Sequence, residues 1–373
     1  MKNVVIVGGS FAGVSTAHRI LKQAANTSTG SFKVILVSRD SHFYWNIASP
    51  RGVLPGQISD EELFQPIAAG FARYPADQFE FILASATGID VDGKKLEISG
   101  PDGQSRHIEY DYLILGTGSR TKADTPFKSR GSTEATREAL HAYQKQIKQA
   151  KKIVVVGAGP TGVETAGELA FEYGRGKEIV LISSEKTVLQ GTPASVSKTA
   201  EKQLGTLNVK VRLSTKVQNT AQMADGSQEL TLSSGEKLVA DMVIPTFGVI
   251  PNSSFVPAQF LNANGFVKVD EYLRVKGAEN VFAIGDVSDA EPPQFIYVDK
   301  QSAHTAKNIV LVLRGMALLP YKVATSGMMG LQIGKKAGTG HFGNFKLPSF
   351  LVSTLRKSLF IERLAKTVDG SWF

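Results

Sequence analysis

Two glycine-rich segments of this chain have the spacing that binds phosphate groups. The first runs from Gly8 to Gly13 as Gly8-Gly9-Ser10-Phe11-Ala12-Gly13, directly after an apolar run. In a G-x-G-x-x-G loop the first glycine permits a sharp strand-to-helix turn, the second lets backbone approach a pyrophosphate, and the third lets the helix pack on its strand. Ser10 replaces the second glycine; its small side chain narrows that approach and offers a hydroxyl to a phosphate oxygen. Taken alone, this loop is equally typical of a tight turn.

The second segment repeats the pattern with all three glycines. It reads Gly157-Ala158-Gly159-Pro160-Thr161-Gly162, again after an apolar β-branched run and before a helical pattern. One helix N-terminus carries one pyrophosphate, so two such loops predict two bound dinucleotides.

Length and composition place the chain among ordinary soluble proteins. It has 373 residues, 42% apolar and 20% charged, enough for two or three domains. No run of eighteen apolar residues encodes a membrane-spanning helix. The first predicted strand begins at residue 3 or 4, which leaves no room for a signal or transit peptide. We therefore expect a cytoplasmic protein.

The chain contains no cysteine. This excludes electron transfer through a Cys-x-x-Cys pair, iron–sulfur clusters and thiolate metal sites. The six histidines lack a ligand spacing such as His-Glu-x-x-His, so no metal site is predicted. The net charge of +8 does not by itself select nucleic acid, an anionic membrane or an anionic nucleotide. Because basic and aromatic residues do not interleave, we expect no specific nucleic-acid binding.

The order of elements is repeated along the chain. A strand, a loop, a helix, a polar turn over residues 26–30 and a strand over 33–37 are followed by antiparallel hairpins over 79–112 and a strand ending in Gly116-Thr117-Gly118-Ser119. The second half repeats this with hairpins over 209–240 and a strand before Gly248. A helix from about Asp299 to Gly315 and a last segment of about 55 residues complete the chain.

This order predicts an α/β fold with two Rossmann-like dinucleotide-binding domains, antiparallel hairpin insertions and a C-terminal segment. We expect residues 1–120 and 245–315 to form one discontinuous domain and residues 121–244 the other. Residues 316–373 form the C-terminal segment.

Five motifs, taken in order, resemble those of the two-dinucleotide-binding flavoprotein oxidoreductases. They are "VVIVGGSFAG", "YLILGTGS", "VVVGAGPTGVETAGEL", "MVIPTFGVIPNS" and "VFAIGDVSD". Within that class the chain is similar to the apoptosis-inducing-factor-like group, which includes the ferroptosis suppressor protein and fungal relatives, with type II NADH dehydrogenases as cousins. The C-terminal "LPSFLVSTLRKSLF" extends this closer resemblance, which implies that the C-terminal segment, residues 316–373, lies near the flavin and the acceptor site.

The resemblance implies FAD on the first loop and NADH or NADPH on the second. It places Arg51 against the FAD, the backbone of Ala86 at the adenine and Asp286 at the ribityl chain, although Asp286 could equally cap a helix. The helix expected from Asp299 would face the flavin with its positive end, and Lys300 would add to that charge or lie in solvent. The cofactor-binding residues predicted in all are Gly8, Gly9, Ser10, Phe11, Ala12, Gly13, Ser38, Arg39, Arg51, Ala86, Thr117, Gly118, Gly157, Gly159, Pro160, Thr161, Gly162, Glu164, Gly248, Asp286 and Lys300.

The chain departs from the dinucleotide pattern at the ribose positions. An acidic residue about twenty positions after the loop normally binds the ribose hydroxyls, but the first unit has Ser38 and then Arg39 there. The second unit has Ser183-Ser184-Glu185. A carboxylate at this point repels a 2′-phosphate and serines accept either nucleotide, so we expect both NADH and NADPH to be used, with NADH mildly preferred.

Two residues are predicted to be catalytic. Glu164 resembles the glutamate that positions the nicotinamide for hydride transfer, and Lys357 would polarise a quinone oxygen or lie near the flavin edge; a surface role is the alternative for each. From Ser349 onward, apolar residues recur at helical spacing among Arg356, Lys357, Arg363 and Lys366. This segment could lie on an anionic membrane or pack on the protein.

Together these features favour an FAD-dependent NAD(P)H oxidoreductase with a quinone-type acceptor. We expect a monomer or homodimer in the cytoplasm, either free or peripheral on a membrane. One alternative is a biosynthetic flavoprotein acting on a specific small metabolite. The other is a redox-gated interaction protein.

Overall fold

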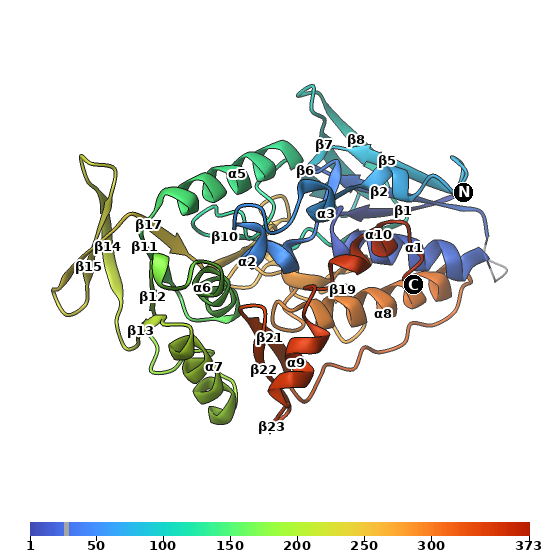
Figure 1. Ribbon diagram of the computed structural model, residues 1–373. Coiled ribbons are helices and arrows are strands. Elements are labelled where there is room, and N and C mark those ends of the chain that lie inside the picture. The colour runs from blue at the N-terminus through green and yellow to red at the C-terminus, as the bar shows by residue number, and fades with distance from the viewer. Residues whose placement is uncertain (26–29) are drawn as a thin grey trace.

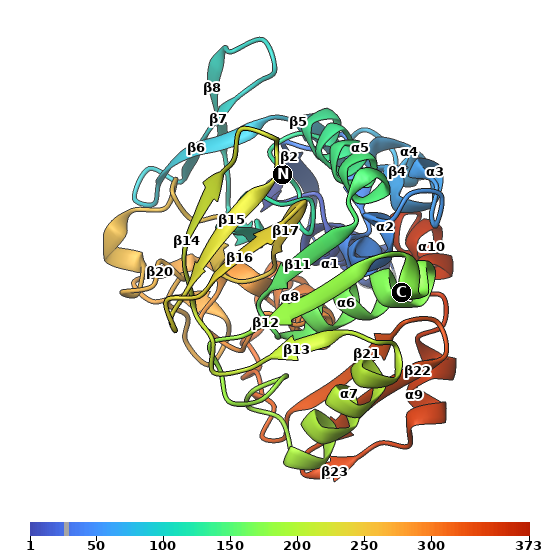
Figure 2. The same cartoon turned by 60° about the vertical axis from the view of Figure 1, so that its left-hand side comes forward.

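The computed structural model describes residues 1–25 and 30–373. Except for Gly30, the predicted polar turn over 26–30 lies outside the described residues. Two parallel sheets organise the chain, as Figures 1 and 2 show. The larger has the order β19-β20-β9-β1-β2-β5, in which only β19 is antiparallel to its neighbour. Its strands are β1 (Lys2–Val7), β2 (Phe32–Ser38), β5 (Phe79–Leu83), β9 (Tyr112–Leu115), β19 (Arg274–Val275) and β20 (Ala278–Ala283).

The second sheet is four-stranded and wholly parallel, in the order β13-β12-β11-β17. Its strands are β11 (Lys152–Val156), β12 (Glu178–Ile182), β13 (Lys210–Arg212) and β17 (Met242–Pro245). Continuous Val, Ile and Leu runs form the central strands of both sheets, because a parallel strand covered on both faces is apolar throughout. The fold is therefore α/β with two Rossmann-like units, as predicted.

The two units have the same backbone hydrogen bond at their glycine loops. The Gly8 amide donates to the carbonyl of Val37 at the end of β2, and the Gly157 amide donates to that of Ile182 at the end of β12, both at 2.8 Å. Both glycines have positive φ, 125° and 109°, which a residue with a side chain rarely adopts. The predicted internal repeat is thus present at the level of single hydrogen bonds.

Helices cover the sheets and connect their strands. The longer ones are α1 (Phe11–Ala25), α5 (Thr133–Gln149), α6 (Pro160–Tyr173), α7 (Ala194–Thr206) and α8 (Phe295–Leu313). The short ones are α2 (Ser49–Gly52), α3 (Asp60–Leu63), α4 (Ile67–Gly70), α9 (Ser349–Leu355) and α10 (Leu364–Val368). Helices α1 and α8 pack along each other beside the larger sheet. None of the helices described is long and apolar enough to cross a bilayer.

Antiparallel strands extend from both parallel sheets, mostly where the turn residues predicted them. The strands of two three-stranded sheets are connected by turns at Asp92-Gly93 and Asp102-Gly103 in the first sheet and at Asp225-Gly226 and Ser234-Gly235 in the second. These are β6 (Ser85–Asp90), β7 (Lys95–Ser99) and β8 (Ser105–Glu109), then β14 (Val217–Gln222), β15 (Gln228–Leu232) and β16 (Lys237–Ala240). The prediction was wrong for residues 79–83 and 210–212, which are the parallel strands β5 and β13. The smaller pairs are β3 (His42–Tyr44) with β4 (Phe64–Pro66) and β10 (Ser119–Thr121) with β18 (Val249–Pro251).

The C-terminal segment forms a small unit of its own. Strands β21 (Met328–Ile333), β22 (Ala337–Phe342) and β23 (Phe345–Lys346) make an antiparallel sheet on which α9 packs. The chain then returns so that α10 and the C-terminus lie beside α1 (Figure 1). The helical spacing expected to continue from Ser349 is wrong, because α9 ends at Leu355 and the chain then turns at Leu359 and Phe360, both with positive φ.

Candidate active site

A cleft of about 340 Å³ lies at the carboxyl ends of β1, β2 and β9. This is the edge at which open α/β sheets bind ligands. The cleft brings together most of the residues predicted for the first cofactor. These are Gly8, Gly9, Ser10, Phe11, Ala12, Ser38, Arg39, Ala86, Thr117, Gly118 and Asp286.

The first loop fits a bound pyrophosphate by its own geometry. A Cβ on Gly8 would clash with the carbonyl of Gly116, and one on Gly9 would clash with the Ser38 hydroxyl. A Cβ on Gly13 would clash with the carbonyl of Gly8, so the third glycine permits the close helix packing expected of it. The first-turn amides of α1 have no partner within the helix and are available to an anion. Ser10 stays exposed and lines the cleft, as a small residue at that place should.

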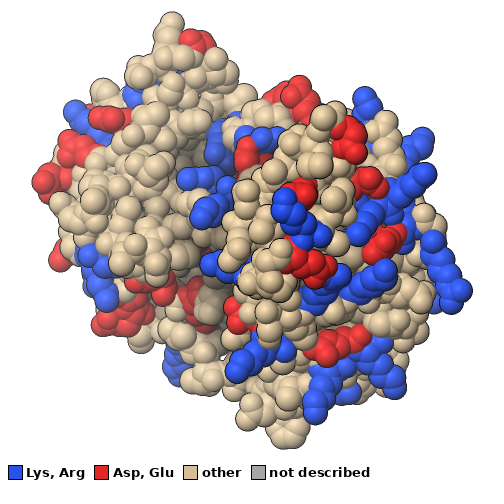
Figure 3. Space-filling view, turned by 90° about the vertical axis from the view of Figure 1, so that its left-hand side faces the viewer, with Lys and Arg blue, Asp and Glu red and all other residues tan. Residues whose placement is uncertain are grey.

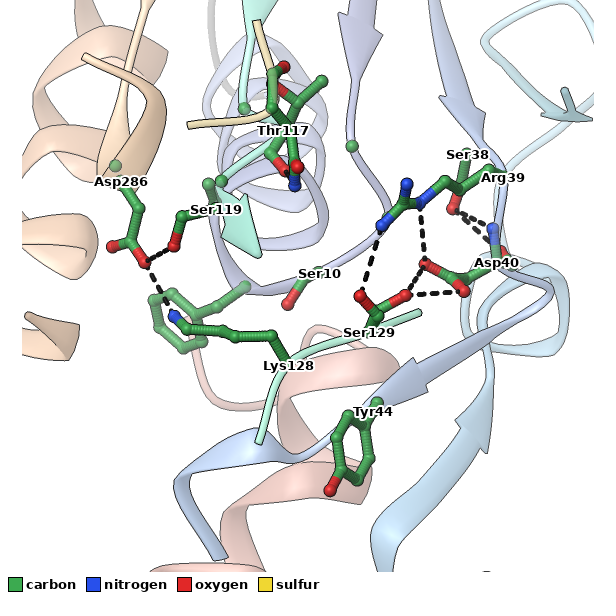
Figure 4. A pocket seen from close by; sticks show the side chains of 18 of the residues that line it. Ser10, Ser38, Arg39, Asp40, Tyr44, Thr117, Ser119, Lys128, Ser129 and Asp286 are labelled. Carbon is green, nitrogen blue, oxygen red and sulfur yellow. Dashed lines mark hydrogen bonds and ion pairs between the residues drawn. The ribbon is translucent and has the colours of Figure 1, made fainter. Parts of the chain in front are cut away.

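Residues 38–40 form one end of the cleft, to the right of Ser10 in Figure 4. The Ser38 hydroxyl is turned back to the backbone of Asp40, accepting from its amide at 3.1 Å and donating to its carbonyl at 2.8 Å. The Asp40 carboxylate accepts from Ser129 Oγ at 2.8 Å and lies 3.8 Å from Arg39 Nε. Burial raises the pKa of Asp40, and Ser129 and Arg39 offset part of this rise. Ala86 lies nearby in β6, where it pairs with Ile98 of β7, and it also lines the cleft.

Asp286 marks the opposite end of the cleft. It lies in a 3-10 turn over residues 285–287 and does not cap a long helix. Its Oδ2 accepts from Ser119 Oγ at 2.8 Å and from Lys128 Nζ at 2.7 Å. Burial alone would raise its pKa, but the Lys128 ammonium and these hydrogen bonds outweigh burial and lower the pKa. Asp286 is therefore an ionised acceptor on the cleft wall.

Aromatic side chains surround the Asp286 end. Phe11, Trp45 and Phe295 line the cleft, with ring centroids of Phe295 4.5 Å from Phe11 and 6.0 Å from Trp45. The C-terminal segment lies directly behind them: Trp45 Nε1 donates to the carbonyl of Leu359 at 2.9 Å, and the Phe373 ring is 6.1 Å from Phe11. No residue of this segment lines the described part of the cleft itself.

The helix expected to face the flavin begins earlier than predicted. Helix α8 starts at Phe295, and Pro293, Gln294, Phe295 and Val298 line the cleft. Asp299 does not begin the helix; its carboxylate pairs with Arg19 of α1 at 2.7 Å. Lys300 points elsewhere, with Nζ bonded to the carbonyl of Lys322 at 2.5 Å and lying over the Tyr321 ring. Its predicted cofactor role stays a prediction.

The second loop has the same construction as the first. A Cβ on Gly162 would clash with the carbonyl of Gly157, while Gly159 faces open space at the N-cap of α6. Pro160 and Thr161 form the first turn. Gly248 has φ 79° and its carbonyl accepts from the amide of Lys122 at 2.9 Å, which ties β10 to β18. At the end of β12, Ser183 is buried and Ser184 and Glu185 are exposed.

Two buried ion pairs join α6 to other parts of the chain. Glu168 accepts from both Arg51 Nε at 3.0 Å and Arg51 Nη2 at 2.7 Å, and Arg51 Nη1 donates to the carbonyl of Lys357 at 2.9 Å. The Arg51 guanidinium is thus held by the Glu168 carboxylate and a backbone carbonyl, and Arg51 is not among the described residues lining the cleft, so its contact with FAD stays a prediction. The side chain of Lys357 is exposed, and its catalytic role likewise stays a prediction.

Glu164 forms the other pair. Its Oε1 accepts from Arg356 Nη2 at 2.8 Å and from the Gln332 amide at 3.2 Å. Burial raises its pKa, and Arg356 and the Gln332 amide partly offset this rise. Within the described chain no hydrogen bond to Oε2 is found, which leaves an acceptor available for a ligand.

Sequence reasoning missed several residues of the cleft. Lys128 and Ser129 lie in an irregular segment, Ser119 ends the motif "YLILGTGS" but was given no role, and Phe295 lies outside the motifs. Only the position of residues 122–131 directly after the Gly118 turn could have drawn attention to that segment.

Figure 3 shows the face that lies on the left in Figure 1. Lysine and arginine side chains gather along a hollow near its middle, and elsewhere both signs of charge are mixed. A basic hollow raises the local concentration of anionic ligands such as nucleotides.

Comparisons with known proteins agree with this geometry. The sequence pattern of the pyridine nucleotide-disulphide oxidoreductase family matches residues 2–308. The chain is 64% identical to oxidoreductase ptaL of Pestalotiopsis fici over all of both chains, and 29% identical to ferroptosis suppressor protein 1 of Mus musculus over 99% of this chain and 96% of that one. Its fold is similar to that of sulfide:quinone oxidoreductase from Aquifex aeolicus, with a TM-score of 0.78 at 19% identity, covering 98% and 92% of the two chains. The chain belongs to the pyridine nucleotide-disulphide oxidoreductase family and is an oxidoreductase that uses FAD and NAD(P)H.

Proposed function

We propose that this protein passes electrons from NAD(P)H through FAD to a quinone-type acceptor. Bound FAD supplies the redox chemistry, taking a hydride from the nicotinamide and passing electrons on. The observation that carries the proposal is the aromatic wall at the Asp286 end of the cleft, made by Phe11, Trp45 and Phe295. Flat apolar rings pack well against such side chains. Since the chain has no cysteine, electrons must leave the cofactor directly.

The N-terminus of α8 supports the same function. Gln294 and Phe295 lie at the cleft, so the unsatisfied first-turn amides of a nineteen-residue helix lie close to it. The positive end of a helix stabilises negative charge that develops beside it. We assign this task to the helix N-terminus and not to Lys300.

Glu164 is proposed to position the nicotinamide. Its Oε1 is held by Arg356 and Gln332, which fixes the carboxylate, and Oε2 remains available to accept a hydrogen bond from a carboxamide. Holding the donor at a fixed distance accelerates a transfer without any proton leaving the side chain.

Anaerobic stopped flow tests this function. The flavin absorbance should bleach rapidly on mixing with NADH and with NADPH, and a short-chain ubiquinone should restore it rapidly. Phe295→Ala should slow the recovery and leave bleaching unchanged. Phe345→Ala, on the exposed β23, should alter neither step. Bleaching without recovery by any quinone would exclude the quinone acceptor and favour a specific metabolite or a redox-sensing role.

We also propose that the protein associates with an anionic membrane through its C-terminal segment. Phe345, Phe350 and Leu355 are 80%, 74% and 61% exposed on β23 and α9. Between Asp299 and Glu362 the chain has no acidic residue, whereas lysines and arginines recur throughout. Apolar side chains among basic ones suit the boundary between lipid headgroups and acyl chains.

Sedimentation with vesicles tests this association. The wild-type protein should bind phosphatidylcholine vesicles that contain phosphatidylserine and release from them at high salt, because exposed charges are screened. Phe350→Ser should weaken binding, and Met223→Ser, exposed on the loop after β14, should not. Equal binding to neutral vesicles, or no binding at all, would contradict the proposal.

A further inference from the structure

One irregular segment, residues 122–131, lies along the cofactor cleft. It is attached at its start, where the Lys122 amide donates to the carbonyl of Gly248 at 2.9 Å, and in its middle, where the carbonyl of Pro126 accepts from Tyr44 at 2.8 Å. Lys128 and Ser129 then bond to opposite ends of the cleft, Asp286 and Asp40. Figure 4 shows these two residues between the two carboxylates and near Ser10 of the glycine loop.

The glycine loop has no cationic side chain of its own. Residues 8–13 provide backbone amides and one hydroxyl, while the pyrophosphate of a dinucleotide carries two negative charges at neutral pH. The cations lining the described cleft are Arg39, Arg120 and Lys128. Arg39 accompanies Asp40 at the end of the cleft formed by residues 38–40.

Arg120 has a different partner. Its Nη1 donates to Asn252 Oδ1 at 3.2 Å, and Asn252 in turn donates to the carbonyl of Thr117 at 2.9 Å. This network holds the turn after β9. Lys128 is therefore the remaining cation of the cleft lining, and its side chain runs past Ser10 to Asp286 (Figure 4).

The contact between Lys128 and Asp286 can be exchanged. The Asp286 carboxylate retains a second donor, Ser119 Oγ at 2.8 Å, if the ammonium turns away. The Lys128 side chain is 28% exposed and ends a flexible four-carbon chain, so its ammonium can change partner without movement of the backbone.

We propose that Lys128 is a cofactor-positioning residue whose ammonium binds the FAD pyrophosphate on the Gly8–Gly13 loop. When the Lys128 ammonium leaves Asp286, the Asp286 carboxylate becomes available to accept hydrogen bonds from the ribityl hydroxyls. Lys128 thus balances the charge of Asp286 before binding and the charge of the phosphates afterwards.

Binding measurements on the full-length protein test the role of Lys128. FAD affinity follows from the rise in flavin fluorescence when holoenzyme is diluted, and ADP affinity from its competition with FAD. Because a hydrogen bond to a charged group contributes about 1.5–3 kcal/mol, Lys128→Gln should weaken binding of both FAD and ADP about tenfold or more. Lys128→Arg should keep most of the affinity. Lys122→Gln removes a charge from the same segment, outside the cleft, and should change neither ligand's affinity.

ADP separates the proposal from its rival, in which Lys128 serves only to hold Asp286 for the ribityl chain. ADP has the pyrophosphate but no ribityl chain. Weaker FAD binding with unchanged ADP binding in Lys128→Gln would overturn the proposal. The double variant with Asp286→Asn gives a second test: Lys128→Gln should still weaken FAD binding in that background, and a vanished effect would show that Lys128 acts only through Asp286. Far-ultraviolet circular dichroism verifies that each variant is folded.

Discussion

His18 should make the stability of this protein sensitive to mild acid. The side chain projects from α1 and is fully buried, and its ring stacks on that of Phe71 with the ring centroids 3.9 Å apart. Its Nε2 lies 2.8 Å from the carbonyl of Val368, which can only accept, so Nε2 carries the proton and Nδ1 accepts from Tyr74 at 3.1 Å. The pKa of His18 is lowered from 6.5 to about 4, chiefly by burial; the bond to Val368 opposes this shift in part, and nearby Arg73 and Lys22 add to it.

The sign and size of the effect follow from this shift. Because the pKa of His18 is lower in the folded state, the unfolded chain binds more protons between pH 6.5 and 4, and the free energy of unfolding falls as the pH falls through that window. The full shift corresponds to about 3 kcal/mol at 1.36 kcal/mol per pKa unit, of which about 2 kcal/mol is lost between pH 7 and pH 5.

Urea unfolding of the holoenzyme, followed by circular dichroism from pH 7 to pH 5, measures this loss. His18→Gln cannot titrate, so it should be less stable than wild type at pH 7, and the difference should shrink by about 2 kcal/mol at pH 5. His107→Gln, on the exposed strand β8, should follow the wild-type curve at every pH. A constant difference between wild type and His18→Gln would refute the reasoning.

Three further changes test other parts of the structure. Gly162→Ala places a Cβ against the carbonyl of Gly157 and should raise the KM for NADH about tenfold or more while FAD content stays normal; an unchanged KM would contradict the role of the second loop. Arg51→Met leaves the Glu168 carboxylate buried without its partner and should cost about 3–5 kcal/mol in urea unfolding, whereas a loss below about 1 kcal/mol would show that the carboxylate finds another partner. Glu185→Gln removes the charge expected to repel a 2′-phosphate and should raise the ratio of kcat/KM for NADPH to that for NADH, a ratio that steady-state assays measure directly; an unchanged ratio would place Glu185 away from the nucleotide.

The glycine loops could be predicted because their constraint is local. Gly8 and Gly157 adopt positive φ, and at Gly13 and Gly162 a Cβ would clash with a backbone carbonyl. Each position therefore requires glycine, and the glycine spacing alone predicts the loop. The apolar runs before each loop predicted buried parallel strands for the same reason. Turn residues such as Asp92-Gly93 predicted hairpins through their own backbone preferences.

The predictions that were wrong concern residues whose local structure depends on contacts with residues far away in the sequence. Asp299 is a residue type that often begins a helix, yet its carboxylate pairs with Arg19 on another helix, and α8 begins four residues before it. The helical spacing after Ser349 is interrupted after Leu355, and Trp45 holds the carbonyl of Leu359 in the turn that follows. Neither partner is near in sequence, so no local pattern could reveal these arrangements.

The buried ion pairs on α6 explain why the candidate site needs the C-terminal segment. Glu164 and Glu168 lie on one helix of the second unit, and their partners Arg356 and Arg51 come from the C-terminal segment and from α2 of the first unit. The Arg51–Glu168 pair is bidentate and fixes both distance and orientation, and the Glu164 carboxylate is fixed by one bond from Arg356 and one from the Gln332 amide. Burying such charges adds little stability, so their effect is mainly on geometry. The second unit is thereby held in one position against the first, which is what transfer between two bound dinucleotides requires.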